Sequence, residues 1–199
     1  MERGDAILVI DLLNDFVHED GDALLSSLRE RAPNIGHVLE VARDTGVPVI
    51  YVNDERGAWT SDAVRLVRIA LEGKAGDLVE PLLPQAGDPV LLKHRYSAFD
   101  HTALDILLES QDVRRVLLVG AATEGCVVQT AIDARERGLK ASIVVDACAT
   151  TSPELEAIAL AYAEKVGGIH LEHVTQEPSI SGSPNQGRVA KSGRAGTRR

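Results

Sequence analysis

The chain has 199 residues, of which 44% are hydrophobic and 26% are charged, and its net charge is −9. That length suits one globular domain with a substantial core, and the negative charge argues against a surface for nucleic acid or for an anionic membrane. The sequence shows neither the roughly 18–20 consecutive apolar residues of a membrane helix nor a signal-peptide pattern, so we expect a cytoplasmic protein. Its two cysteines, Cys126 and Cys148, form neither a disulfide framework nor a CxxC zinc pattern, and we expect both to be reduced.

Apolar segments alternate with helix-like segments along the chain. The expected strands are 6–10, 48–52, 89–92, 115–120, 141–145 and 169–174, and the expected helices are 33–45, 61–72, 102–109, 125–137 and 153–166. Pro33 and Pro153 suit the first turn of a helix, Ser152 suits an N-cap, and Gly46 and Gly138 suit helix C-termini. This alternation predicts an α/β fold with a parallel sheet and right-handed crossovers.

The end of the chain has a different composition. Residues 178–199 are rich in Ser, Gly and Pro, and the stretch from Arg188 to Arg199 holds five basic residues and no acidic one. We expect a disordered basic tail that follows a domain at 1–177. Such a tail could contact RNA or a membrane, or it could be a solubilising extension. For the domain itself we expect neither a nucleic acid nor a membrane as partner.

Residues just after the strands are the candidates for function, because ligands of parallel α/β sheets bind beyond the carboxyl ends of the strands. The positions that this rule selects are Asp11, Asn53, Asp54, Lys93, the 121–126 loop and Asp146.

Three of these side chains suggest chemistry. Asp11, in an apolar setting, could be a general base or could cap a turn. Lys93 needs an anionic partner if it is buried, and otherwise it reaches solvent. Cys126 begins a predicted helix, whose dipole and a nearby cation would lower the thiol pKa; the alternative is an inert buried cysteine, as we expect for Cys148. Together these side chains predict a base, a cation and a nucleophile at one edge of the sheet.

Four of the six aromatic residues lie near the same strand ends, namely Phe16, Trp59, Tyr96 and Phe99. We expect them to wall a pocket, with ordinary packing as the alternative for Phe16 and Phe99. Asn14 and Asp15 are expected to form turns.

The order and spacing of four motifs resembles the isochorismatase-like cysteine hydrolase superfamily. The motifs are VIDLLNDF with Asp11, YVND at 51–54, KHRYSAF with Lys93, and GAATEGCVVQTAIDARERG with Cys126. The resemblance covers about residues 5–175. It implies a doubly wound, mostly parallel six-stranded sheet with helices on both faces, a three-layer arrangement like the Rossmann fold, and assembly as a homodimer or homotetramer.

The resemblance also implies a catalytic triad of Asp11, Lys93 and Cys126. Asp11 would take the thiol proton and later help to activate water, Cys126 would attack a carbonyl and form a thioester, and Lys93 would stabilise the charged pair. By the same analogy, a cis peptide bond between Ala121 and Ala122 would direct the backbone amides of Ala122 and Cys126 into an oxyanion hole.

A small-molecule substrate would contact the side chains around this triad. The expected contacts are Phe16, Asn53, Asp54, Trp59, Tyr96 and Thr123. For Asp54 a loop-stabilising Asx turn is the alternative.

Two departures from relatives in this superfamily reduce the number of activities that we expect for this chain. Nicotinamidases hold a metal with an Asp-x-His motif and further histidines; here Asp54 is present, but position 56 is Arg and no His follows until His94. We therefore predict no metal and no cofactor. Isochorismatases proper lack the nucleophilic cysteine, so Cys126 favours hydrolysis of an amide, carbamoyl or ureido C–N bond. The alternatives are a nicotinamidase-like or isochorismatase activity, a non-catalytic binding module, and a thiol redox protein with Cys148 as resolving partner.

Overall fold

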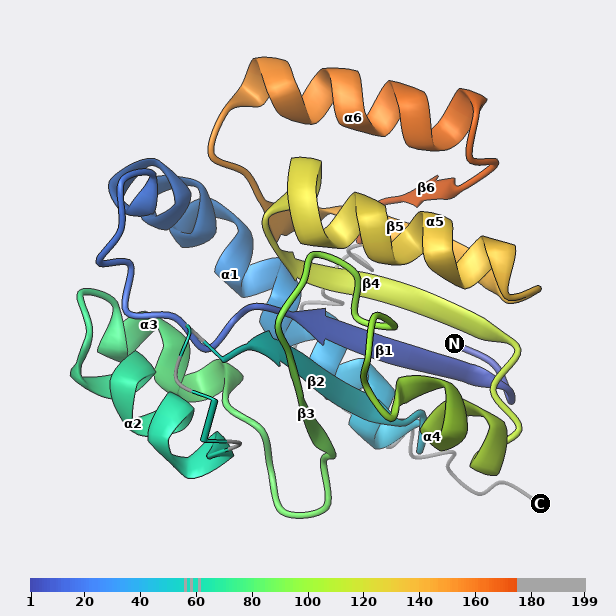
Figure 1. The fold of residues 1–199 in the computed structure, drawn as a ribbon, viewed down its shortest axis with the longest axis horizontal. Helices are drawn as coiled ribbons and strands as arrows, with labels where there is room; N and C mark the ends of the chain where they lie inside the picture. The colour runs from blue at the N-terminus through green and yellow to red at the C-terminus, as the bar shows by residue number, and fades with distance from the viewer. Residues whose placement is uncertain (56, 58, 61, 175–199) are drawn as a thin grey trace, which may run out of the picture.

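The structure of the protein is a computed structural model that describes residues 1–55, 57, 59–60 and 62–174. The strands are β1 (Asp5–Ile10), β2 (Val49–Asp54), β3 (Val90–Lys93), β4 (Arg115–Ala121), β5 (Lys140–Ala149) and β6 (His170–Glu172). They form one six-stranded sheet in the order β3-β2-β1-β4-β5-β6, and every neighbouring pair is parallel (Figure 1). The chain runs outward from β1 to β3 and then builds the other half from β4 to β6, which confirms the doubly wound sheet.

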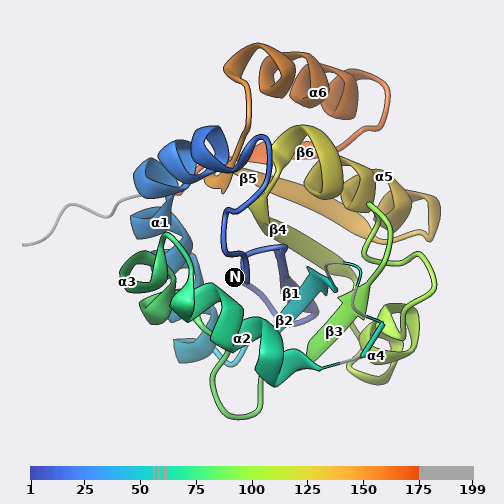
Figure 2. The ribbon, with the colours of Figure 1, turned by 60° about the vertical axis from the view of Figure 1, so that its left-hand side comes forward.

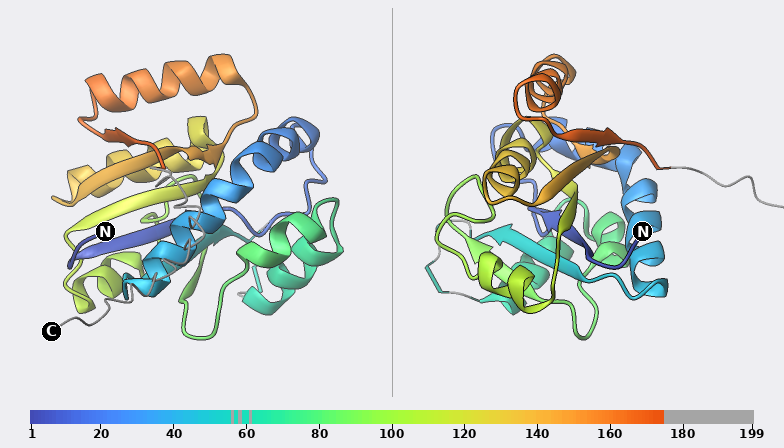
Figure 3. Two further views of the ribbon diagram at one scale, coloured as in Figure 1. Left: turned by 180° about the vertical axis from the view of Figure 1, so that it is seen from behind. Right: turned by 90° about the vertical axis from the view of Figure 1, so that its right-hand side faces the viewer.

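Helices cover both faces of this sheet. They are α1 (Gly21–Asp44), α2 (Ala63–Glu72), α3 (Gly76–Val79), α4 (Leu104–Ser110), α5 (Val128–Glu136) and α6 (Pro153–Lys165). A 3-10 turn at Glu80–Leu82 follows α3, and a π turn at Thr123–Val127 precedes α5. One face packs against α1, α2 and α3 and the other against α4, α5 and α6, which gives the expected three layers (Figures 2 and 3).

The central strand β1 is buried on both sides. Ile7 and Val9 belong to the core beneath α1, whereas Ala6, Leu8 and Ile10 belong to the core on the opposite face. A strand covered on both faces needs apolar residues at consecutive positions, which explains the unbroken run AILVI.

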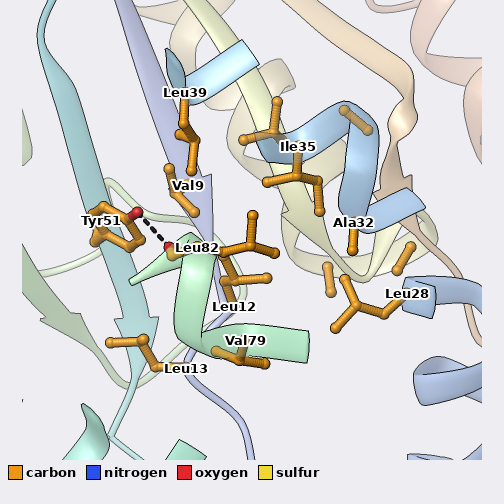
Figure 4. Close-up of a cluster of buried hydrophobic side chains, with 14 of the residues drawn as sticks. Val9, Leu12, Leu13, Leu28, Ala32, Ile35, Leu39, Tyr51, Val79 and Leu82 are labelled. Carbon is orange, nitrogen blue, oxygen red and sulfur yellow. Dashed lines mark hydrogen bonds between the residues drawn. The ribbon is translucent and has the colours of Figure 1, made fainter. Parts of the chain in front are cut away.

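The core beneath α1 is held by one buried hydroxyl as well as by apolar packing. Leu28, Ile35 and Leu39 of α1 belong to the same cluster as Val9 of β1, and Leu39 lies beside Val9 (Figure 4). In the same cluster, the Tyr51 hydroxyl donates a hydrogen bond of 2.6 Å to the carbonyl oxygen of Leu82. Burial raises the pKa of Tyr51 to about 12, so its hydroxyl stays protonated and keeps this bond.

The first helix begins earlier than the sequence predicts. The expected helix at 33–45 is the second half of α1, and Pro33 lies inside the helix instead of in its first turn. Pro33 removes one backbone donor, but buried leucines before and after it pack on the sheet, and this packing outweighs the local preference. The short α3 and the 3-10 turn that follows it were not predicted.

The other helix-end predictions are confirmed. Ser152 caps α6 by accepting a hydrogen bond from the Leu155 amide, and Pro153 occupies the first helical position. Gly46 and Gly138 follow α1 and α5 with φ of 71° and 84°, a conformation that glycine adopts at low cost.

No helix in the described part of the chain is long and apolar enough to cross a membrane. The predicted tail at 178–199 and the domain boundary at residue 177 lie outside the described residues.

Candidate active site

The candidate site lies where the doubly wound sheet reverses its direction of growth. β1 and β4 are neighbours, and the segments that leave their carboxyl ends carry Asp11 and the 122–126 loop. This is the place at which ligands of open α/β sheets bind. Gly120 permits the close approach of the two strands, because it has φ of 118° and an added Cβ would lie 2.1 Å from the Ile10 carbonyl oxygen.

Lys93 connects the other two candidate side chains. Its Nζ lies 2.8 Å from Asp11 Oδ2 and 3.2 Å from Cys126 Sγ, and it donates a third bond of 3.0 Å to the carbonyl oxygen of Arg95. These partners satisfy all three donors of the ammonium group. Since the side chain is only 1% exposed, the alternative that Lys93 reaches solvent is wrong.

Asp11 is held at both carboxylate oxygens. Oδ2 pairs with Lys93, and Oδ1 accepts a bond of 2.6 Å from the Asp54 amide. Burial raises the pKa of Asp11, although Lys93, the Cys126 thiol and the Asp54 amide act in the opposite direction. A carboxylate with a raised pKa is a stronger base, which suits removal of a proton from a thiol.

Cys126 lies in the π turn just before α5 and is partly buried. Burial raises the pKa of its thiol to about 12; Asp11 contributes to the increase and Lys93 opposes it. The expected lowering of the pKa is therefore wrong in direction, because burial and a carboxylate outweigh the cation. At neutral pH Cys126 is therefore a thiol, and the Asp11 carboxylate, which contacts the same Lys93 ammonium, is placed to accept its proton.

Cys148 has a different environment. It is fully buried, its thiol donates a long bond of 3.5 Å to the Leu118 carbonyl oxygen, and burial raises its pKa. Both cysteines are free, and the burial of Cys148 fits the inert role expected for it.

The loop that carries Cys126 is anchored by Glu124, which sequence reasoning missed. The peptide bond between Ala121 and Ala122 is cis, as the family resemblance implied. The Glu124 carboxylate then accepts bonds of 2.8 Å from the Thr150 hydroxyl and from the Thr151 amide. Burial alone would raise the pKa of Glu124, but the hydrogen bonds from Thr151 and Thr150 lower it. Glu124 thus ties the loop to the segment after β5.

Thr123 forms a second anchor on α6. Its side chain is fully buried, and its hydroxyl contacts the Ala149 carbonyl oxygen at 3.1 Å and the Glu156 carboxylate at 3.0 Å. Glu156 also pairs with Arg31 of α1 at 3.4 Å. The structure gives Thr123 a positioning role and does not bring its side chain to the pocket. Glu124 and Glu156, which form these two anchors, were hard to predict from the sequence, because neither glutamate follows a strand directly.

Two pockets meet at the Asp11–Lys93–Cys126 cluster. The larger, of about 600 Å³, is lined by Asp54, Lys93, His94, Arg95, Tyr96, Ser97, Asp100, Cys126, Gln129 and Asp133. The smaller, of about 220 Å³, is lined by Asp11, Leu13, Asn14, His18, Asp20, Leu24, Asn53, Asp54, Ala121, Ala122 and Thr151. Lys93 and Cys126 border the larger pocket, Asp11 borders the smaller one, and Asp54 lines both.

The polar and aromatic residues expected around the pocket differ from one another in their exposure and in their contacts. Tyr96 lines the larger pocket and is 71% exposed. Trp59 is also exposed, and its ring stacks on His94 with 4.0 Å between centroids. Asn53 borders the smaller pocket, but its amide is bonded to both backbone groups of Leu13 at 2.8 and 3.1 Å.

Four other residues that the sequence singled out lie in the cores, in a turn or inside a strand. Phe16 and Phe99 are buried in the two cores, so the packing alternative holds for their side chains. Asn14 accepts a bond from the Phe16 amide, a turn contact of the expected kind. Asp146 lies inside β5, which extends to Ala149, and its carboxylate accepts a bond from the Val174 amide.

A buried glutamate beside the larger pocket also escaped sequence reasoning. Glu55 is 1% exposed, and its carboxylate lies 3.1 Å from Nε2 of His94, the residue on which Trp59 stacks. His94 lines the pocket, and the buried Glu55 carboxylate holds His94 without lining the pocket itself. Within the described residues, no group of three or more His, Cys, Asp or Glu side chains could hold a metal ion.

Comparisons with known proteins in sequence and in structure agree with one another. A sequence model described as the isochorismatase domain matches residues 5–174. The uncharacterized isochorismatase family protein YaaI of Bacillus subtilis is 33% identical, over 90% of this chain and 99% of its own length. The ureidoacrylate amidohydrolase RutB of Caulobacter segnis is 32% identical, over 75% of this chain and 74% of its own. Among solved structures, the nicotinamidase SaPncA of Staphylococcus aureus has a TM-score of 0.68 at 27% identity, with 86% of this chain and 100% of that chain covered.

Proposed function

This chain belongs to the isochorismatase family, and from that premise we propose that it is a hydrolase that cleaves a C–N bond of a small molecule through a Cys126 thioester. The bond is an amide, carbamoyl or ureido bond. One observation carries the proposal: the Lys93 ammonium contacts both the Asp11 carboxylate and the Cys126 thiol at the edge of a pocket. Relatives that hydrolyse amides or ureides support the same reaction class.

Acylation begins with a proton transfer. Asp11 takes the proton from Cys126 Sγ as the sulfur attacks the substrate carbonyl carbon. Negative charge thereby leaves the carboxylate and develops on the substrate oxygen, where we assign the backbone amides of Ala122 and Cys126 as donors. When the C–N bond breaks, Asp11 returns the proton to the leaving nitrogen, and the acyl group remains on sulfur.

Deacylation uses the same base. Asp11 takes a proton from water, the resulting hydroxide attacks the thioester carbonyl, and the acid product leaves as the proton returns to Sγ. Lys93 stays charged throughout: burial alone would lower its pKa, but Asp11 and Cys126 outweigh that effect and raise it. An ammonium that contacts both groups stabilises the negative charge on whichever of them carries it.

The proposal includes no metal and no cofactor. The expected absence of a metal rests on the sequence. Zinc and iron sites in proteins commonly use imidazole ligands, but no histidine follows Asp54 until His94. We also propose that the enzyme acts in the cytoplasm, where its two free cysteines would remain reduced.

A substrate screen tests the proposal. The purified protein is incubated with a panel of small carboxamides, carbamoyl compounds and ureides, and ammonia release is measured. We expect Cys126→Ala to abolish the release of ammonia from any compound that the wild type hydrolyses. Cys148→Ala, which removes a fully buried thiol that contacts the Leu118 carbonyl oxygen, is the matched control and should retain turnover. Undiminished turnover by Cys126→Ala would contradict the mechanism, and no turnover across the panel would favour the non-catalytic binding module.

A further inference from the structure

Three residues that line the larger pocket follow one another along the segment that carries the candidate nucleophile. Cys126 lies in the π turn, and Gln129 and Asp133 follow it on α5 at positions i+3 and i+7. Residues at this spacing lie on the same side of a helix, one and two turns from the first. Since a helix rises ~1.5 Å per residue, Asp133 lies about 10 Å from Cys126 along the axis. The pocket therefore extends from the nucleophile to a carboxylate two turns away.

The charge of Asp133 is only weakly balanced by its neighbours. Nη1 of Arg137 lies 3.9 Å from Asp133 Oδ2, at the outer limit of an ion pair. The same guanidinium lies 3.1 Å from Asp105 Oδ1 and sits over the Phe99 ring, 4.6 Å from its centroid. Gln129 adds a long hydrogen bond of 3.5 Å to the Asp133 carboxylate. Asp105 and Phe99 thus hold Arg137, and Asp133 presents negative charge to the pocket.

The lysine and the arginine that line the pocket already have carboxylate partners. Lys93 Nζ lies 2.8 Å from Asp11, and Arg95 Nε lies 3.5 Å from Asp100. Asp54 contributes a further carboxylate to the pocket wall. The summed charge of this wall is therefore negative, so the pocket attracts a cationic group of a ligand and repels an anionic one.

The aromatic part of the wall suits a cation as well. Tyr96 lines the pocket and is 71% exposed, so much of its ring is accessible to a ligand. An ammonium group that contacts the face of such a ring is attracted by its π electrons. The neighbouring His94 lies 3.1 Å from the buried Glu55 carboxylate, which balances the charge of a proton on the imidazole. His94 therefore adds no uncompensated positive charge.

We propose that the substrate carries an ammonium or guanidinium group at the far end of its chain, and that Asp133 binds this group. The inference rests on the proposed hydrolysis at Cys126, because the reacting carbonyl fixes the other end of the chain. An extended chain of six bonds spans about 7 Å, and the contacts with the Cys126 sulfur and with the carboxylate complete the span. The side chain of a helical residue leans toward the N-terminus of the helix, which brings the Asp133 carboxylate toward Cys126. Asp133 is thereby a specificity-determining residue.

Binding to the Cys126→Ala protein, which cannot form an acyl intermediate, tests the proposal without turnover. Calorimetry compares 6-aminohexanamide with two probes of similar length, the neutral heptanamide and the anionic monoamide of adipic acid. We expect the cationic probe to bind at least about tenfold more tightly than the neutral one, with the anionic probe weakest. Added salt should reduce this preference. An anionic probe that binds as tightly as the cationic one, or no measurable binding of 6-aminohexanamide, would overturn the proposal.

Asp133→Asn locates the preference, and Asp105→Asn is the matched control. Both aspartates pair with Arg137, but of the two only Asp133 is among the described residues that line the pocket. We expect Asp133→Asn to weaken the binding of 6-aminohexanamide about five- to tenfold and to leave heptanamide unaffected. Asp105→Asn should change neither, and Asp133→Glu, which keeps the charge, should retain the preference. Circular dichroism checks that each variant is folded. Unchanged binding of 6-aminohexanamide by Asp133→Asn would overturn the assignment.

Ammonia release from the same probes by the otherwise wild-type enzyme separates this inference from the proposed reaction. A charge preference in binding without hydrolysis of any probe would support the cation site and contradict hydrolysis at Cys126. Hydrolysis of the neutral and anionic amides as fast as the cationic one would support the reaction and overturn the inference. With 3-aminopropanamide, whose ammonium group is too close to the carbonyl to reach Asp133, the Asp133→Asn variant should retain the wild-type kcat/KM.

Discussion

Lys93 Nζ lies 2.8 Å from the Asp11 carboxylate and 3.2 Å from the Cys126 sulfur, so one buried ammonium contacts both groups between which a proton would move. The contact with Asp11 favours the ionised form of the proposed base and opposes the effect of burial, and the contact with Cys126 stabilises the thiolate as it forms.

The two charged neighbours of Cys126 should change its reactivity in opposite directions. Asp11 raises the pKa of Cys126 and Lys93 lowers it. We therefore expect Asp11→Asn to label faster with iodoacetamide than the wild type at neutral pH, and Lys93→Met to label more slowly. Mass spectrometry of the labelled peptides measures both rates, with buried Cys148 as an internal reference. A shift of the same sign in both variants would contradict the arrangement.

The pH dependence of turnover should follow the ionisation of Asp11. Only the ionised carboxylate can accept the thiol proton, and burial raises its pKa. Activity is therefore expected to fall as the pH decreases through this raised pKa, above the range of an ordinary aspartate. The measurement is kcat/KM against pH, with circular dichroism at each pH to confirm that the protein is folded. Constant activity down to the pH of acid unfolding would exclude Asp11 as the base.

The contacts of Thr123 should matter for catalysis even though its side chain does not reach the pocket. Thr123→Val keeps the shape but removes the one hydroxyl hydrogen that the Glu156 carboxylate and the Ala149 carbonyl share, which should cost about 1–3 kcal/mol of stability. Because the turn that holds Cys126 loses an anchor, we expect kcat to fall about tenfold with little change in KM. Thr45→Val, at the end of α1, is the control and should leave kcat unchanged. If both variants retain wild-type kcat, the anchor has no role in positioning Cys126.

The close approach of β4 to β1 predicts a large difference between two glycine substitutions. Gly120→Ala places a Cβ 2.1 Å from the Ile10 carbonyl oxygen at φ of 118°, so we expect a loss of about 3 kcal/mol or more. Gly138→Ala meets nothing within 4 Å at φ of 84° and should cost only about 1 kcal/mol. Urea unfolding measures both values. Equal losses would show that the contact at Gly120 is relieved by a small shift of the strands.

Removal of metal ions should not affect the enzyme. The Asp-x-His pattern of metal-binding relatives is interrupted at position 56, which is Arg. Activity measured after dialysis against EDTA is therefore expected to equal that of the untreated protein. A loss that added zinc or manganese restores would contradict this prediction and would revive the nicotinamidase-like alternative.

Most of the fold could be predicted from the sequence, because its strands are buried on both faces and read as continuous apolar runs. All six expected strands occur, and their ends locate Asp11 and Lys93. The start of α1 could not be predicted, since the local preference of Pro33 for a first turn is overridden by packing along the whole helix.

The candidate site was only partly predictable. Strand ends suggested that Asp11, Lys93 and Cys126 share one edge of the sheet, but the contacts among them depend on the strand order, which spacing alone does not give. The pKa of Cys126 was predicted in the wrong direction because its burial is a property of the packed fold. Glu124 and Glu156 were missed for a similar reason: their partners are distant in the sequence.

The central claim is that Cys126 forms a covalent acyl intermediate, and mass spectrometry of acid-quenched enzyme tests it most directly. During turnover of a compound from the screen, we predict an acyl group on the peptide that contains Cys126, which disappears when the substrate is exhausted. Asp11→Asn should show little or no adduct, because the leaving nitrogen then lacks its proton donor. Turnover without any adduct on Cys126, together with an active Cys126→Ala variant, would contradict the proposed mechanism.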